Sequence, residues 1–197
     1  HTVTVELPDL RFEKTVMNVT TGQNPGTNAT QGDTLRYRLY IENASDTPVD
    51  NFSVVDELDR LNATPLFQAG TLNVVTQVDL AANAEFGHTR VQREAEEAAL
   101  LTTTAVAQAA GSRYRYFGFD LGGGLIRHQL ETCLQGEAAH AEINGAFVLD
   151  RKRHVDNHVS VDHAAPGCSS SQFFRGVLGD RSRGVFNGRA LIRRGSD

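Results

Sequence analysis

Imidazole and thiol side chains, the usual ligands of zinc and iron, gather in one stretch at His154, His158, His163 and Cys168. A strand advances about 3.3 Å per residue, so His154 and His158 share a face but lie about 13 Å apart, too far to share an ion. His163 has the opposite parity and faces the other way. Only His163 and Cys168 remain as candidate metal ligands, joined by a bend at 164–167. Because a stable site needs more ligands than two, we favour a polar strand face and predict no metal site.

Other residues that could bind a ligand or take part in catalysis occur in weaker patterns. The glycines at 122–124 lack the Lys-Ser/Thr that follows in a phosphate-binding loop, so they indicate a tight corner between strands. Ser169–Ser171 lie near Asp162 and His163 in sequence only, which is no catalytic triad. Asp156 and Asp162 share parity but lie about 20 Å apart along a strand, too far for the acid pair of a sugar-acting enzyme. We therefore predict no catalytic residues and no enzyme.

The elements that position these residues have the pattern of strands. Residues 147–192 alternate between apolar and polar types and are interrupted by Gly, Pro and Ser. The same alternating pattern extends back to Leu72. Residues 94–110 are rich in Ala and Glu, which permits a helix, but their β-branched alternating centre predicts a strand. Turn signals recur 25 to 31 residues apart at Asn83, Gly111, Gly136 and Gly167. Strand-rich units of this length predict a coil of strands stacked into a solenoid over residues 72–197.

Residues 1–71 differ from the rest of the chain in composition and charge. They hold five basic and ten acidic residues, whereas residues 72–197 hold fourteen of each. Short strands rich in Thr and Val, such as 34–42, predict a small antiparallel β-sandwich here. The sequence thus predicts an all-β chain of two domains, 1–71 and 72–197.

Composition indicates which cellular compartment and which classes of binding partner to expect. The chain is 40% hydrophobic and 22% charged, and no apolar run approaches the roughly 20 residues that span a membrane. It opens without a signal-peptide pattern. Its two cysteines, Cys133 and Cys168, form no disulfide framework and favour a reducing compartment. Arginines near the C-terminus alternate with apolar residues, which favours a solvated strand face over nucleic-acid binding.

Five Asn-x-Ser/Thr sequons occur, all before residue 71. Glycosylation is one interpretation, and the other, which we favour, is that an Asn- and Thr-rich strand region produces such matches freely. The sequons lie at Asn18, Asn28, Asn43, Asn51 and Asn62.

Residues 7–70 resemble a known repeat of bacterial surface proteins. The order Asp9-Leu, Lys14-Thr-Val, Gly32-Asp-Thr-Leu-x-Tyr and Val54-Val-Asp-x-Leu is similar to Ig-like or prealbumin-like stalk modules. Some related modules join a strand lysine to an asparagine beside a buried acid. Lys14 and Asp56 match two of those parts, but no partner asparagine is identifiable, so we interpret Lys14 as a solvated strand residue.

Residues 72–197 resemble the SufB/SufD family of iron–sulfur cluster assembly scaffolds, SufD in particular. The resemblance is carried by an ordered set of motifs: Phe119-Asp-Leu-Gly-Gly, Gly136-Glu-x-Ala, Asn144-Gly, His154-Val-Asp-x-His, Val161-Asp-His, Cys168-x-Ser-x-Gln, Arg175-Gly-Val and Arg183-Gly-Val-Phe-Asn-Gly. It implies a right-handed parallel β-helix, a cytoplasmic location, a non-catalytic role, and SufB and SufC homologues as partners. It implies an iron–sulfur cluster only in the full complex, and none bound by this chain.

Compared with that family, we expect the chain to be truncated at both ends and joined to its N-terminal part near residues 69–73. No functional residue carries over. The alternative function is a structural or adhesive surface protein in which the β-helix is a stalk, but the SufD-like motifs are denser and cover more of the chain. A solenoid whose last rung is open also predicts self-association through that edge.

Overall fold

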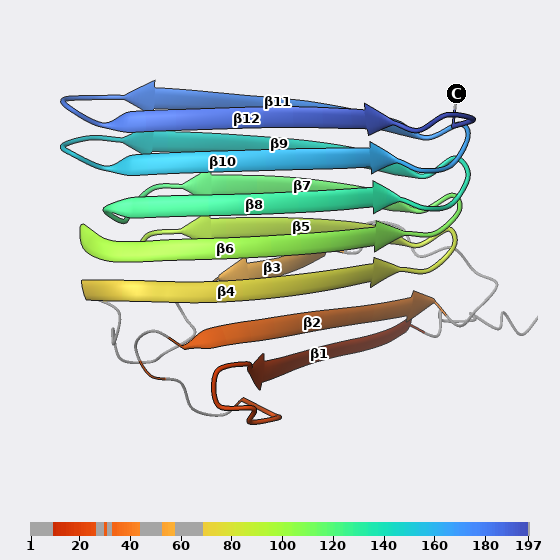
Figure 1. The fold of residues 1–197 in the computed structure, drawn as a ribbon, viewed down its shortest axis with the longest axis horizontal. Helices are drawn as coiled ribbons and strands as arrows, with labels where there is room; N and C mark the ends of the chain where they lie inside the picture. The colour runs from red at the N-terminus through yellow and green to blue at the C-terminus, as the bar shows by residue number, and fades with distance from the viewer. Residues whose placement is uncertain (1–9, 27–29, 31–32, 44–52, 58–68, 197) are drawn as a thin grey trace, which may run out of the picture.

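The computed structural model describes residues 10–26, 30, 33–43, 53–57 and 69–196, and within these the chain contains only strands, turns and loops (Figure 1). The strands are β1 Leu10–Asn18, β2 Thr34–Asn43, β3 Ser53–Glu57, β4 Ala69–Leu80, β5 Glu85–Gln92, β6 Glu97–Gln108, β7 Arg113–Asp120, β8 Leu125–Leu134, β9 His140–Leu149, β10 His154–His163, β11 Ser169–Leu178 and β12 Arg183–Ile192. The all-β prediction is confirmed for these residues. The part of the chain that the structure describes contains no helix able to span a membrane.

The strands form two sheets that the chain visits in turn. Sheet A has the order β1-β2-β4-β6-β8-β10-β12, and sheet B has the order β11-β9-β7-β5-β3. From β2 onward, each strand pairs in parallel with the strand two positions along the chain, so each coil adds one strand to each sheet (Figure 1). This is the predicted solenoid, and β6 shows that residues 97–108 form a strand and no helix.

The N-terminal part does not show the predicted antiparallel sandwich among its described residues. One antiparallel pair is present, β1 with β2. However, β2 pairs in parallel with β4, and β3 pairs in parallel with β5, so both strands continue the solenoid sheets. Strand β4 also runs through the expected join at residues 69–73. The sequons at Asn28, Asn43, Asn51 and Asn62 lie wholly or partly outside the described residues, and the domain boundary at 71 stays a prediction.

The core lies between the two sheets because alternate side chains of the solenoid strands face inward and most of these are apolar. Along β6 and β10, every second side chain is buried. Inward-facing residues from successive coils stack on one another in register, as Leu130 of β8 and Val159 of β10 do. Burying alternate residues on both sheets supplies the main favourable free energy of this fold.

Tight turns join the coils at positions that the sequence marks. Asn83, Gly111 and Gly167 have φ of 60°, 66° and 66°, the left-handed region that glycine and asparagine tolerate best. At Gly136 the reason for a glycine is steric. A Cβ atom at Gly136 would lie 2.0 Å from the backbone nitrogen of Ala110 in the preceding coil. The backbones of adjacent coils therefore approach too closely at this corner for any side chain.

Replacing Gly136 with alanine should therefore destabilise the fold. The added methyl group meets backbone atoms, which cannot rotate away, so we expect a loss of about 1–3 kcal/mol in the free energy of unfolding, as overpacked sites show. Urea denaturation followed by circular dichroism would measure it. Gly179→Ala is the control, because it lies outside the left-handed region and its Cβ would make only ordinary van der Waals contacts, the nearest at 3.7 Å. Equal stability of G136A and wild type would contradict the close approach.

One sequon position is described in detail. The Asn18 side chain is 1% exposed, and its Nδ2 donates a hydrogen bond of 2.9 Å to Oδ2 of Asp33. The nitrogen that would carry a glycan is thus buried and bonded, which favours the interpretation of Asn18 as a structural residue.

Candidate functional site

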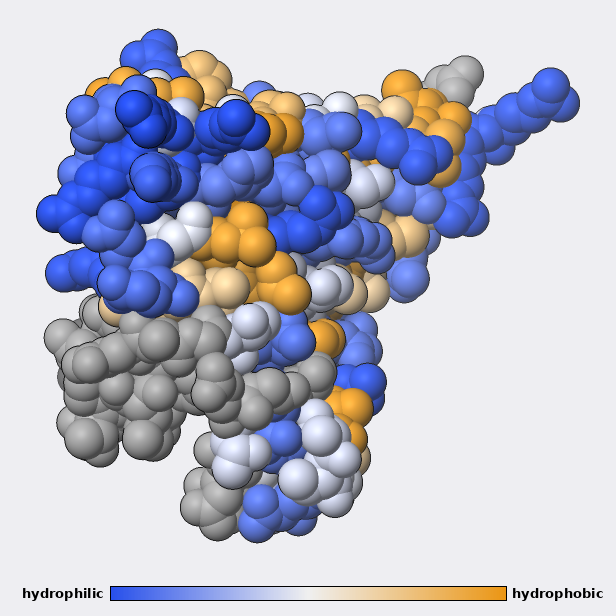
Figure 2. Space-filling model, turned by 60° about the vertical axis from the view of Figure 1, so that its left-hand side comes forward, coloured by the Kyte–Doolittle hydropathy of each residue, from blue (hydrophilic) through white to orange (hydrophobic). Residues whose placement is uncertain are grey.

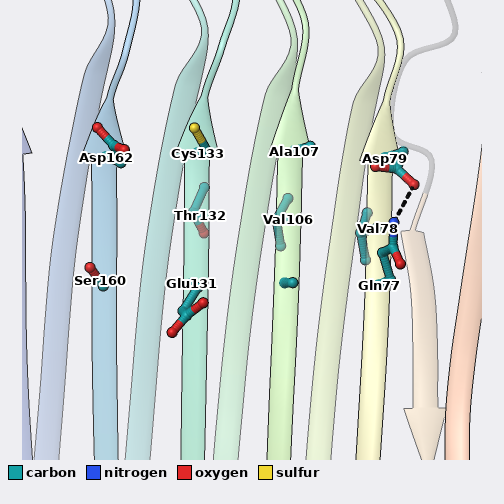
Figure 3. Close-up of a pocket in the computed structure, with 11 residues that line it drawn as sticks. Gln77, Val78, Asp79, Val106, Ala107, Glu131, Thr132, Cys133, Ser160 and Asp162 are labelled. Atoms are coloured by element: carbon teal, nitrogen blue, oxygen red, sulfur yellow. Dashed lines mark hydrogen bonds between the residues drawn. The ribbon is translucent and has the colours of Figure 1, made fainter.

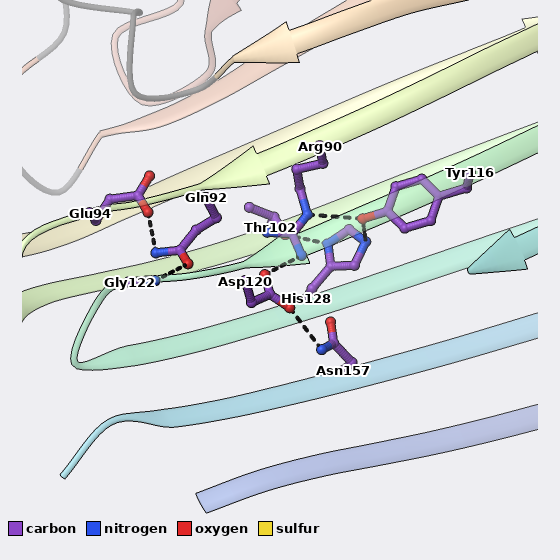
Figure 4. Close-up of polar contacts among 9 residues, drawn as sticks. All are labelled: Arg90, Gln92, Glu94, Thr102, Tyr116, Asp120, Gly122, His128 and Asn157. Atoms are coloured by element: carbon purple, nitrogen blue, oxygen red, sulfur yellow. Dashed lines mark hydrogen bonds and ion pairs between the residues drawn. The ribbon is translucent and has the colours of Figure 1, made fainter. Parts of the chain in front are cut away.

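A group of polar side chains lies inside the solenoid, between the two sheets (Figure 4). Sheet B contributes Arg90 from β5 and Tyr116 and Asp120 from β7. Sheet A contributes Thr102 from β6, His128 from β8 and Asn157 from β10, which are neighbours in register. All six side chains are buried. They occupy the same inward positions as the apolar residues before and after them on their strands, so the alternation of each strand forces them inward.

An ion pair forms the centre of this buried polar network. Arg90 Nη2 lies 2.6 Å from Asp120 Oδ1, and their side chains are 4% and 3% exposed. Burial by itself would lower the pKa of Arg90, but the negative charge of Asp120 holds it above its ordinary value. Because each charge is out of water, each depends on the other for compensation.

The network continues from the ion pair to sheet A. Arg90 Nε donates to Tyr116 Oη at 2.9 Å, and Tyr116 Oη lies 3.1 Å from His128 Nε2. His128 Nδ1 in turn bonds the Thr102 hydroxyl. Burial, together with the charge of Arg90, lowers the pKa of His128 well below 6.5, so the ring is neutral at pH 7. The ring can then donate from one nitrogen and accept at the other, as this chain of hydrogen bonds requires.

The second oxygen of Asp120 connects to a third coil. Asn157 Nδ2 donates to Asp120 Oδ2 at 2.9 Å. A Cβ atom at Gly118 would lie 2.8 Å from Tyr116 Oη, so the glycine leaves room for the tyrosine hydroxyl to reach its partners. The network therefore joins strands β5, β6, β7, β8 and β10 through side chains alone. The network holds the coils in register, and most of its polar atoms are hydrogen-bonded to other members of the network.

The neutral state of His128 predicts a dependence of stability on pH. Its folded pKa lies below the unfolded value of about 6.5, so the unfolded chain binds an extra proton when the pH falls below 6.5. The contribution of His128 to the free energy of unfolding is fully present above about pH 6.5. Below that pH the free energy of unfolding should fall by up to about 1.4 kcal/mol per pH unit. Urea denaturation between pH 7.5 and pH 5, values that bracket about pH 6.5, would show this slope. His128→Gln should remove most of it, and His140→Gln, a half-buried outer position, should not; a flat wild-type profile would contradict the assignment.

The side chains of the two metal candidates, His163 and Cys168, bond different groups. His163 is buried and its Nε2 lies 2.8 Å from Ser170 Oγ. Cys168 Sγ donates instead to the carbonyl of Gly136 at 3.3 Å. His154 and His158 sit on the outer face of β10, opposite to His163, as the parity argument predicts. Within the described ranges, no group of three or more His, Cys, Asp and Glu residues is arranged to hold a metal ion. Metal binding by His163 and Cys168 stays a hypothesis that these contacts do not support.

The family model described as SUF system FeS cluster assembly, SufBD core domain, matches residues 47–197. This chain belongs to the SufBD core family. The match spans β3 to β12, which is the whole of the described solenoid after β2.

Curated relatives of the SufBD core chain agree with the family match. An iron–sulfur cluster assembly SufBD family protein of Synechocystis is 29% identical over 160 residues, 80% of this chain and 34% of that protein. The iron–sulfur cluster assembly protein SufD of Escherichia coli is 25% identical over 156 residues, 79% of this chain and 35% of that protein. The chain thus spans about a third of the length of these relatives. No solved structure matches it significantly.

Sequence reasoning missed the buried network of this SufBD core chain. The signal was present: His88, Arg90 and Gln92 follow Phe86 at every second position, so they share its inward face. A charged residue with the parity of a core phenylalanine indicates a buried partner of opposite charge. The sequence does not say that the partner is Asp120, because 30 residues separate the two and only the coil length brings them together.

Proposed function

We propose that this chain acts as a non-catalytic scaffold piece in SUF iron–sulfur cluster assembly. The observation that carries the proposal is the SufBD core match over residues 47–197, together with relatives named for iron–sulfur cluster assembly. The buried network supports a framework role because its polar groups are bonded to one another inside the coil. Such a core fixes the coils and leaves the outer faces of both sheets available to partners.

The family relationship supports three finer points of the proposal. The coil is right-handed, since crossovers between parallel strands of one sheet nearly always are. The chain works in the cytoplasm, where its two free cysteines stay reduced. Its partners are homologues of SufB and SufC.

A pull-down of the tagged chain against SufB and SufC homologues tests the proposal. Capture of SufB by the full chain is the expected result, and a version of the chain lacking residues 1–71 would show whether the N-terminal part contributes. A chain with an intact β signal by circular dichroism that captures neither partner would refute the scaffold role.

Self-association through the last coil is a separate expectation. Strands β11 and β12 each pair on one side only, with β9 and β10. Apolar residues are exposed there, including Phe173 at 54% and Ile192 at 63%. Unpaired strand edges of this kind associate with other chains, so we expect multimers in light scattering. Ile192→Lys should shift the distribution toward monomer, since edge lysines block pairing; a wild-type chain that is strictly monomeric at high concentration would contradict the expectation.

A further inference from the structure

The outer face of sheet A contains a groove that the scaffold proposal does not use (Figure 3). Its volume is about 330 Å³, and it runs along β6 between β4 and β8. The groove exists because β6 has alanine at two successive outward positions, Ala105 and Ala107. The neighbouring strands carry longer side chains beside them. In register, Gln77, Ala105 and Glu131 form one row, and Asp79, Ala107 and Cys133 form the next.

The groove combines an apolar floor with acidic walls. Methyl groups of the two alanines form the floor, while Asp79 stands on one wall and Glu131 on the other. The walls are two strand spacings apart, about 10 Å, which admits one aliphatic chain lying along β6. Figure 3 shows the wall side chains rising from β4 and β8 on either side of β6.

The two wall carboxylates have only neutral partners. Asp79 Oδ2 accepts a hydrogen bond of 3.2 Å from Gln77 Nε2, and Glu131 Oε1 accepts one of 2.6 Å from Gln129 Nε2. Among the described residues neither carboxylate takes part in an ion pair, although the structure contains several others on its surface. Both negative charges are therefore available to a ligand.

The other polar groups at the rim of the groove make it a poor site for a metal ion. Asp162, at the edge of the groove, is already held by Arg193, whose Nη2 lies 2.6 Å away and keeps the pKa of Asp162 below its ordinary value. Burial, and then the charge of Asp162, raises the pKa of Cys133, so its thiol is protonated at neutral pH and is a poor metal ligand. The groove thus has two open negative charges and an apolar floor.

We propose that this groove is a docking site for a lysine side chain on a partner protein. A lysine carries an aliphatic stem that packs on apolar surface and a charged end with three hydrogen-bond donors. The stem lies on Ala105 and Ala107, and the ammonium group reaches the carboxylates of Asp79 and Glu131. The charge complementarity identifies the occupant as a cation, and the length of the alanine floor identifies it as one with a stem.

Protection of Cys133 from alkylation tests the proposal directly, because its thiol lines the groove. The experiment uses the full chain with Cys168→Ala, so that iodoacetamide reacts at one thiol. The probes are a short peptide with one lysine and matched peptides with norleucine or arginine in its place. We expect the lysine peptide to slow the reaction in a saturable manner, and norleucine, which has the stem without the charge, to leave it unchanged.

Variants of the walls complete the test. Asp79→Asn and Glu131→Gln should each weaken protection by the lysine peptide by roughly fivefold, the effect of losing one exposed ion pair. Glu97→Gln, at the far end of β6, is the matched control and should leave protection unchanged. Equal protection by the norleucine or arginine peptide, or by free spermidine, would overturn the proposal, as would protection that persists in the double variant or no protection by any peptide.

Discussion

Replacing Arg90 with methionine is expected to cost about 3–5 kcal/mol in the free energy of unfolding, the usual penalty when one partner of a buried ion pair is removed. Methionine fills much the same volume, so the loss comes mainly from Asp120. That carboxylate is 3% exposed in its side chain and would keep only the hydrogen bond from Asn157. A chain at the lower end of the ordinary range of stability, about 5 kcal/mol, would then be close to unfolding at room temperature.

Two further variants separate the ion pair from general damage to the core. Arg115→Met removes an arginine that points outward on β7 and pairs with Glu85 at 3.4 Å, with its own side chain 51% exposed. It should cost less than about 1 kcal/mol. The double variant Arg90→Met with Asp120→Leu should recover much of the loss, since no uncompensated charge remains. If Arg90→Met and Arg115→Met were equally mild in urea denaturation, the pair would not be buried in solution.

Leu130→Ala is expected to have the second largest effect. Leu130 is fully buried on β8 and packs in the apolar cluster that includes Val106, Val159 and Ile143. Strands lie above and below it in both sheets, so the coil cannot collapse into the space that the deleted atoms leave. We expect a loss of about 2–5 kcal/mol, the range for leucine deletions in rigid cores.

The neighbouring residue provides the control for this variant. Gln129 faces outward on the same strand, so Gln129→Ala should change stability by no more than about 0.5 kcal/mol. Thermal unfolding of both variants by calorimetry would measure the difference. Similar losses for the two positions would mean that β8 is not in the register described, because a shift of one residue exchanges its two faces.

The strands of this protein could be predicted from its sequence because alternation is a local property. In β10, His154 and His158 fall on the outer face and His163 on the inner face by parity alone, as the structure shows. The turn positions were equally readable, since Asn83, Gly111 and Gly167 tolerate left-handed backbone. Even residues 97–108, where helix formers are frequent, followed their alternation and formed β6.

Only the tertiary structure decided which residues meet across the coil. Parity places Arg90 and Asp120 inside, but their contact depends on the length of one coil and on the sheet to which each strand belongs. The same reason explains why the antiparallel sandwich predicted for the N-terminal part is not shown: β2 alternates as a sandwich strand would, and only its parallel pairing with β4 shows that it extends the solenoid sheet. The sequence by itself thus determined the strands, their faces and the repeating coil, while the long-range register decided the buried network and the groove.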